Sequence, residues 1–258
     1  MSLRKFGNYD LHGRTSYAVN PVAMVCKHAM CPVGKAGKCW HRKMAARLAM
    51  NPSISDEKRA AYAGGAPVLD LEKIVDAAQA SDQSTIALQF MGDLMSPDLP
   101  MDFLPSALSA VALCIPRHTV LMLTREPYYY RTRLAKRPPS ANLWLGGSAS
   151  FSGDMERVCD ELRRMREHGW HTWLSLEPLL GEVTAEHVVH CTRGAVEWIA
   201  LGPETGPGAR ACHPAWLEAA AAGAKMAGIP VYDKRDLWHG QRVCLGRRAP
   251  WAAETLER

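Results

Sequence analysis

Three cysteines stand close together near the start of the sequence, at Cys26, Cys31 and Cys39. Thiolates are soft ligands that suit zinc ions or iron–sulfur clusters, and the glycines and proline between these cysteines would let the chain fold around one metal centre. Three cysteines with one open position would suit a [4Fe-4S] cluster, whereas His28 or His41 as a fourth ligand would complete a zinc site. The C-x4-C-x7-C spacing matches no standard zinc pattern closely, and simple packing of unligated thiols also stays open.

Basic side chains surround these cysteines, at Lys27, Lys35, Lys38, Arg42, Lys43 and Arg47. Their positive charge would lower the pKa values of the thiols and could attract a polyanion such as DNA or RNA. The whole chain has 31 Lys and Arg against 26 Asp and Glu, a net charge of +5. This mild basic bias favours acidic partners, although an ordinary solvated surface gives the same balance.

The rest of the chain alternates short apolar runs with longer amphipathic segments. Strands are predicted at 85–90, 119–124, 142–146, 172–176, 197–201 and 229–232, and helices at 71–80, 104–114, 127–136, 154–168 and 214–227. Continuous apolar strands joined by helices indicate a parallel sheet that is covered on both faces. The predicted fold class is therefore α/β, a complete or partial β/α barrel with a Cys-rich N-terminal loop, and a doubly wound open sheet is the alternative.

We interpret the 258 residues as one barrel domain. Residues 1–66 form its Cys-rich N-terminal segment and residues 67–258 its regular βα units, with a glycine-rich turn at 63–67 between them. No apolar run approaches the roughly 18 residues that a membrane span needs, and no hydrophobic signal core follows the first residues, so a cytoplasmic protein is expected.

Polar side chains follow several predicted strands at the point where each strand ends. Asp93, Glu177 and Glu204 are such residues, and we expect them to converge because a barrel builds its active site from the loops after its strands. Any one of them could instead cap a helix. The Gly- and Pro-rich loop from Gly202 to Arg210 would let the backbone approach a ligand and place Arg210 near a carboxylate or phosphate, unless it is only a rigid turn.

Taken in order, these motifs resemble one family, the phage- and prophage-encoded three-cysteine-motif proteins of unknown function, which are similar to radical S-adenosylmethionine (SAM) enzymes. The resemblance covers nearly the whole chain. Besides the cysteines, it rests mainly on FMGDL at 90–94, LSLEPLLG at 174–181 and GPETGPGAR at 202–210.

The resemblance implies a partial β/α barrel, TIM-like and similar to that of radical-SAM enzymes, in which Cys26, Cys31 and Cys39 ligate a [4Fe-4S] cluster that chelates SAM. Its chemistry would be reductive cleavage of SAM to a 5′-deoxyadenosyl radical, which abstracts hydrogen from a bound substrate. By the same resemblance, the residues that would bind SAM or substrate are Gly92, Asp93, Ser175, Glu177, Gly202 and Glu204. Catalytic roles would fall to Glu177, Glu204 and Arg210.

Three functions follow as hypotheses. The first is a radical-SAM-like enzyme that modifies a nucleic acid or nucleotide, in the cytoplasm of a phage-infected or prophage-bearing bacterial cell, with DNA, RNA or a protein encoded nearby as partner. The second is a zinc-stabilised phage accessory protein that binds nucleic acid or a partner without radical chemistry. The third is a metal-free barrel hydrolase or lyase that uses Glu177 and Glu204 as acid and base.

Overall fold

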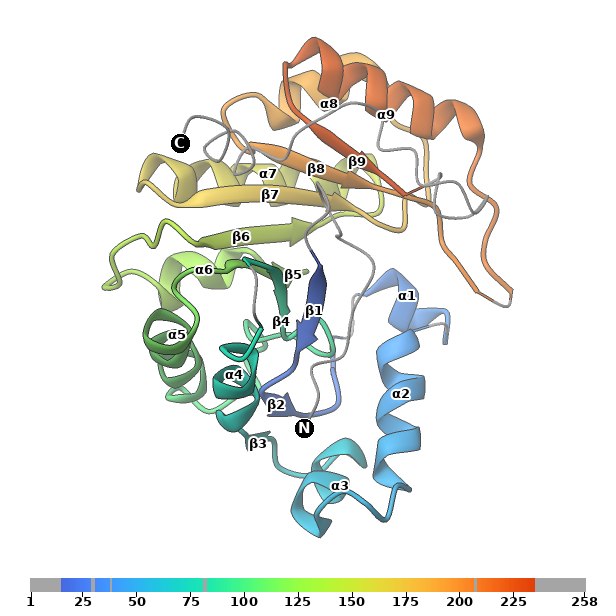
Figure 1. Cartoon of the computed structure of the whole chain (residues 1–258). Coiled ribbons are helices and arrows are strands. Elements are labelled where there is room, and N and C mark those ends of the chain that lie inside the picture. Colours follow the sequence, from blue (N-terminus) through green and yellow to red (C-terminus); the bar gives the residue numbers. More distant parts are fainter. Residues whose placement is uncertain (1–14, 29–30, 38, 81–82, 207, 235–258) are drawn as a thin grey trace. The chain divides into compact units, whose positions relative to one another are not determined.

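A computed structural model describes residues 15–28, 31–37, 39–80, 83–206 and 208–234 of the chain. These residues form two compact units, which divide between Met122 and Leu123. Each unit is α/β, with parallel strands connected by helices (Figure 1). Lys38, one of the basic residues near the cysteines, lies outside the described residues.

Three parallel strands lie side by side in the first unit, in the order β1 (Ser16–Val19), β4 (Thr85–Leu88) and β5 (Thr119–Thr124). Ser16 pairs with Thr85, and Thr85 pairs with Thr119, so the three strands start level. A small antiparallel sheet pairs β2 (Val22–Ala23) with β3 (Val68–Leu69). Every residue of β4 is buried, as expected for a parallel strand with both faces covered.

The helices of the first unit are α1 (Pro32–Lys35), α2 (Trp40–Ala49), α3 (Asp56–Tyr62), α4 (Glu72–Ala77) and α5 (Phe103–Cys114). A small apolar core joins α2 and α3 to β2 and to the residue Met91 beyond β4, through Ala45, Ala61 and Tyr62. This core fixes the segment that carries the cysteines to the end of β4. The turn at 63–67 lies inside this unit, between α3 and β3.

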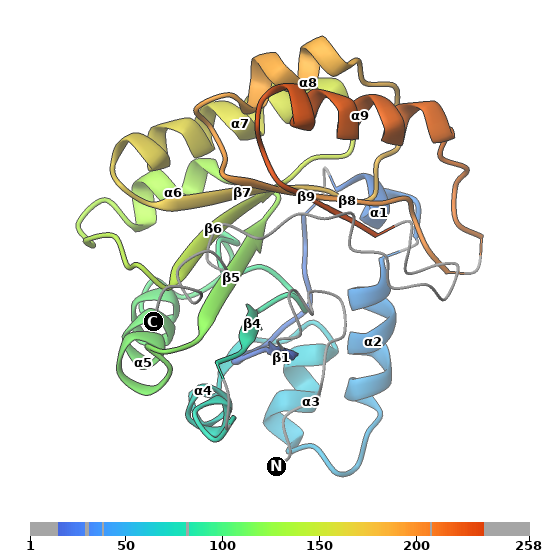
Figure 2. The same cartoon turned by 45° about the horizontal axis from the view of Figure 1, so that its top comes forward.

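The second unit repeats the βα pattern with four parallel strands, in the order β6 (Leu143–Ser148), β7 (His171–Leu176), β8 (Trp198–Leu201) and β9 (Val231–Asp233). Its helices are α6 (Tyr128–Arg133), α7 (Ser152–Glu167), α8 (Ala185–Thr192) and α9 (Pro214–Met226) (Figure 2). Trp173 and Trp198 are both fully buried, and their ring centroids lie 4.9 Å apart.

Each predicted strand and helix is confirmed to within a few residues. The sequence missed α8, which is short and rich in β-branched residues, although Thr184 caps it by accepting a hydrogen bond from the His187 N–H. It also missed α2, and it missed α3, in which four of the seven residues are charged. None of the helices in the described part of the chain has the length and apolar character that a membrane crossing requires.

Helix α7 packs closely on β6 because Gly147 has no side chain. The apolar face of α7 is buried as predicted, through residues that include Val158 and Leu162. A Cβ atom at Gly147 would lie 2.4 Å from Val158 Cγ1, which is far closer than two carbon atoms can approach. The distance between helix and strand is therefore set by this glycine.

We predict that Gly147→Ala destabilises the protein by about 1–3 kcal/mol, because overpacking forces α7 away from β6. Gly153→Ala is the matched control, since its Cβ atom would meet nothing within 4 Å. Alanine favours a helix over glycine, so the control should keep or slightly raise stability. Urea unfolding of both variants tests this, and equal midpoints would contradict it.

Candidate functional site

The three cysteines lie on one continuous segment of the first unit. Cys26 follows β2, Cys31 caps α1 by accepting a hydrogen bond from the Gly34 N–H at 3.4 Å, and Cys39 directly precedes α2. All three are free thiols and are half-buried. The helix starts thus fix the backbone positions of Cys31 and Cys39, and all three sulfurs stay within reach of solvent.

The electrostatics of Cys26 show that the three thiols share one neighbourhood. Burial is the largest cause that raises the pKa of Cys26 to about 11; a backbone hydrogen bond at His28 acts in the opposite direction, and the charges of Asp93, Cys39 and Cys31 add smaller increases. The sequence predicted the opposite direction, from the basic residues nearby, and for Cys26 that prediction is wrong. The basic side chains that the structure describes there, Lys27, Lys35, Arg42, Lys43 and Arg47, are exposed. Solvent therefore screens their charge, whereas desolvation acts directly on the thiol.

Asp93 ties the end of β4 to the cysteine segment. Its Oδ2 atom is hydrogen-bonded to His28 Nε2 at 2.8 Å, and its Oδ1 atom accepts a hydrogen bond from the Met95 N–H at 2.8 Å. Both side chains of the His28–Asp93 pair are nearly buried. The carboxylate predicted to bind SAM is therefore close to the predicted metal ligands, and its direction is fixed from two sides.

Gly92 is packed tightly between this turn and the segment before Cys26. Its φ is +122°, a value that residues with a side chain rarely adopt. A Cβ atom at this position would lie 2.9 Å from Met24 Sδ. The glycine is thus needed for the backbone turn and for the close approach of Met24.

Gln89 is the residue that sequence reasoning missed in this unit, because the strand was expected to continue to residue 90. Instead, Gln89 leaves the strand with a φ of 56°. Its buried amide accepts from the Val22 N–H at 2.8 Å and donates to the Val22 carbonyl at 3.0 Å, and also to the Met91 carbonyl at 2.6 Å. The Asn20 side chain accepts from the Met91 N–H at 2.7 Å. A glutamine at the end of a buried strand was the available signal.

His41, the other proposed zinc ligand, is buried in the same segment. Its Nε2 atom is hydrogen-bonded to the Met24 carbonyl at 3.1 Å, and its buried Nδ1 atom has no hydrogen-bond partner among the described residues. Burial lowers the pKa of His41, so the ring is neutral at pH 7.

In the second unit, Ser175, Glu177 and Gly202 come together at the ends of neighbouring strands. Lys234, which follows β9, contacts both carboxylate oxygens of Glu177, at 2.8 and 2.9 Å. Ser175 donates to Glu177 Oε2 at 3.4 Å. A Cβ atom at Gly202 would lie 3.2 Å from both Glu177 Oε1 and Lys234 Cβ, so the glycine makes room for the ion pair. Sequence reasoning did not pair Lys234 with Glu177, which lies 57 positions earlier in the chain.

Glu204 and Arg210 close the Gly- and Pro-rich loop on itself. The guanidinium donates to both carboxylate oxygens, at 2.8 and 2.7 Å, and the Arg210 N–H donates to Glu204 Oε2 at 2.8 Å. The carboxylate expected near Arg210 is therefore the chain's own Glu204. Such a bidentate pair is strong and directional.

The sequence matches the family described as "Protein of unknown function (DUF5131)" over residues 15–248. The chain belongs to this family. The DUF5131 match includes the cysteine segment and the strand ends of both units. No curated protein matches the chain.

The candidate residues of this DUF5131 protein thus form two groups. Asp93 lies beside the cysteines in the first unit, and Glu177 and Glu204 lie at strand ends in the second. The expected convergence of these three acids stays a prediction.

We predict that Gln89→Ala lowers the free energy of unfolding, by about 1–3 kcal/mol for each buried group of Val22 that loses its partner. Gln79→Ala is the matched control, because Gln79 is exposed and should change stability little. Chemical unfolding of both variants measures the difference. If the two variants unfold at the same denaturant concentration, the Gln89 amide does not hold the cysteine segment in place.

Proposed function

We propose that this protein is a radical-SAM-like iron–sulfur enzyme that modifies a nucleic acid or a nucleotide. The observation that carries the proposal is that Cys26, which senses the charges of Cys31 and Cys39, also senses that of Asp93, whose carboxylate His28 fixes in place. The resemblance to phage- and prophage-encoded three-cysteine-motif proteins supports the same assignment.

A cluster requires less closeness of the three thiols than a single zinc ion does. Around tetrahedral zinc, with Zn–S bonds of about 2.3 Å, two sulfurs lie about 3.8 Å apart. Within the described part of the chain, the Sγ atoms of these three cysteines do not all lie within 4.8 Å of one another. In a [4Fe-4S] cluster each cysteine binds a different iron, so its sulfurs are farther apart.

The chain's own residues would bind the cluster and orient SAM. When bound, a reduced [4Fe-4S] cluster supplies the electron that cleaves SAM to methionine and a 5′-deoxyadenosyl radical, which takes a hydrogen atom from the substrate. Cys26, Cys31 and Cys39 would ligate the cluster. Asp93, held by His28, would accept a hydrogen bond from the SAM amino group, and Gly92 would keep that turn narrow.

Residues of the second unit would hold SAM or the substrate. Ser175, Gly202 and Glu177 offer a hydroxyl, a bare backbone and a carboxylate that Lys234 fixes in place. Glu204 and Arg210 would act as a preformed pair in the loop. The fold that goes with this proposal is a partial β/α barrel, which the parallel strands of both units support.

Helix α2 supports a nucleic acid as the substrate. Arg42, Lys43 and Arg47 are exposed on it, and Trp40, at its first position, is 51% exposed. Cationic side chains bind phosphates, and an exposed aromatic ring can stack on a base. The phage association of the similar proteins would place this activity in the cytoplasm of an infected or prophage-bearing bacterium, with a protein encoded nearby as a further partner.

One observation favours the zinc-stabilised binding protein as a second candidate. The buried Nδ1 atom of His41, which has no hydrogen-bond partner among the described residues, could serve as a fourth ligand beside the cysteines. His41 lies two residues after Cys39, so both could bind the same zinc ion. A protein with such a zinc site would need no radical chemistry.

We expect protein purified without oxygen to contain about four iron and four sulfide per chain. The triple variant Cys26→Ala, Cys31→Ala, Cys39→Ala should lose both, and with them reductive cleavage of SAM. The double variant Cys114→Ala, Cys212→Ala removes half-buried free cysteines from other positions and should keep them. One zinc per chain, lost in the triple variant and in His41→Ala, would instead establish the second candidate.

We also expect Lys43→Glu with Arg47→Glu to weaken binding of single-stranded DNA or RNA. A plot of log affinity against log salt concentration has a negative slope, and loss of two phosphate contacts should make this slope less steep by about 1.4. Arg193→Glu with Lys225→Glu, at exposed positions of the second unit, makes the same change in net charge. Equal weakening by both double variants would show that net charge, rather than the α2 surface, controls binding.

A further inference from the structure

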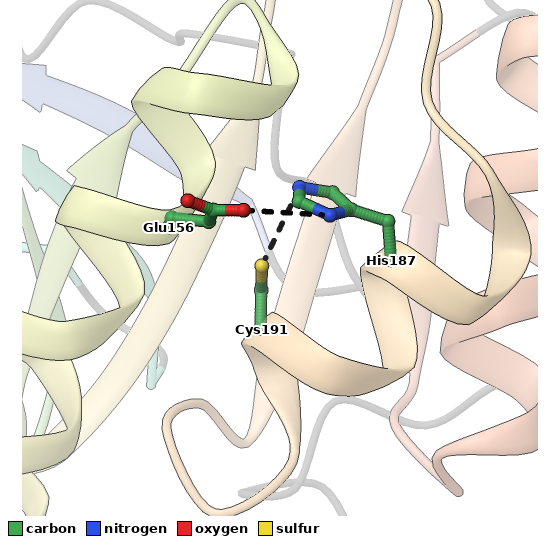
Figure 3. A group of neighbouring side chains, drawn as sticks. All are labelled: Glu156, His187 and Cys191. Atoms are coloured by element: carbon green, nitrogen blue, oxygen red, sulfur yellow. Dashed lines mark hydrogen bonds and ion pairs between the residues drawn. The ribbon is translucent and has the colours of Figure 1, made fainter.

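Three potential metal ligands meet between α7 and α8 in the second unit, on residues that the proposed function does not use. Glu156 comes from α7, and His187 and Cys191 come from α8. One ligand atom from each residue lies within 4.8 Å of the other two. Figure 3 shows the three side chains turned toward one another, with one dashed line from the His187 ring to the Glu156 carboxylate and one to the Cys191 sulfur.

The separation of Cys191 and His187 matches that around a bound zinc ion. Cys191 Sγ lies 3.6 Å from His187 Nε2, and Glu156 Oε1 lies 3.7 Å from the other ring nitrogen, Nδ1. A sulfur and a nitrogen on one tetrahedral zinc ion, with bonds of about 2.3 and 2.0–2.1 Å, lie about 3.6 Å apart. The thiol and the imidazole are therefore already at the separation that such an ion needs.

The backbone holds these ligands in place. His187 and Cys191 are four residues apart on one helix, so they share one face. Arg163 donates to the Cys191 carbonyl at 2.9 Å, which anchors this turn of α8 to α7. Cys191 is buried, His187 is partly buried and Glu156 is exposed, so the site is closed on one side and open to solvent on the other.

We propose that Glu156, His187 and Cys191 bind one zinc ion between α7 and α8, with a water molecule in the fourth position. Thiolate, imidazole and carboxylate are zinc's usual protein ligands, and three of them leave one position open. This site is separate from Cys26, Cys31 and Cys39, and it does not depend on the proposed function.

Zinc has to displace the thiol proton. Burial, together with the charges of Glu156 and Asp160, raises the pKa of Cys191 to about 11, while Arg163 acts in the opposite direction. As the Sγ–zinc bond forms, the S–H bond breaks and the proton passes to solvent. Neither zinc nor the ligands change oxidation state.

The test uses the full chain, stripped of metal with a chelator and titrated with zinc. Cys191→Ala should bind one zinc fewer per chain than the unaltered protein. Glu156→Gln, at an exposed position, should keep the fold and weaken zinc binding at this site by about tenfold or more. Loss of a residue that only hydrogen-bonds to a metal ligand already costs about that much affinity. His190→Ala removes an exposed histidine from the same helix and is the matched control.

Every variant keeps Cys26, Cys31 and Cys39, so zinc bound there is common to all and cancels in the comparison. Equal zinc content in Cys191→Ala and the unaltered protein would overturn the proposal. So would equal weakening by His190→Ala and Glu156→Gln. If Cys191→Ala fails to fold by circular dichroism, Glu156→Gln decides, because unchanged zinc affinity in that variant contradicts the site.

Discussion

The amide of Gln89 makes the same pair of hydrogen bonds to Val22 that a neighbouring strand would make. These bonds take the place of one pair of strand-to-strand hydrogen bonds where β4 ends. They hold the segment that follows β2 against the end of β4. Cys26 lies four residues beyond Val22, and Asp93 lies four residues beyond Gln89. The closeness of thiols and carboxylate therefore depends on one buried side chain that itself touches neither.

Each candidate acid at a strand end has a basic partner. Asp93 contacts His28, Glu177 contacts Lys234, and Glu204 contacts Arg210. A carboxylate without a partner would be costly to bury, and pairing lets these acids sit at low exposure in defined orientations. A ligand that binds at one of these positions competes with a built-in basic side chain, so selectivity depends on how well it replaces that partner.

Periodicity in the sequence predicted the strands and most of the helices, because burial on a regular element leaves a regular pattern. It also predicted that polar residues follow the strands. It did not predict which residues pair: Gln89 and Val22 are 67 positions apart, His28 and Asp93 are 65 apart, and Lys234 and Glu177 are 57 apart. Contacts over such separations are set by the assembled sheet, and no local pattern encodes them. The direction of the Cys26 pKa shift was missed for the same reason, since desolvation is a property of the folded chain.

The raised pKa of Cys26 also affects how fast this thiol is oxidised. At neutral pH its sulfur remains a protonated thiol, and a thiol attacks disulfides and peroxides far more slowly than a thiolate does. Freshly folded protein therefore loses this thiol slowly to mixed disulfides or sulfenic acid. The burial that disfavours its ionisation also keeps it reduced.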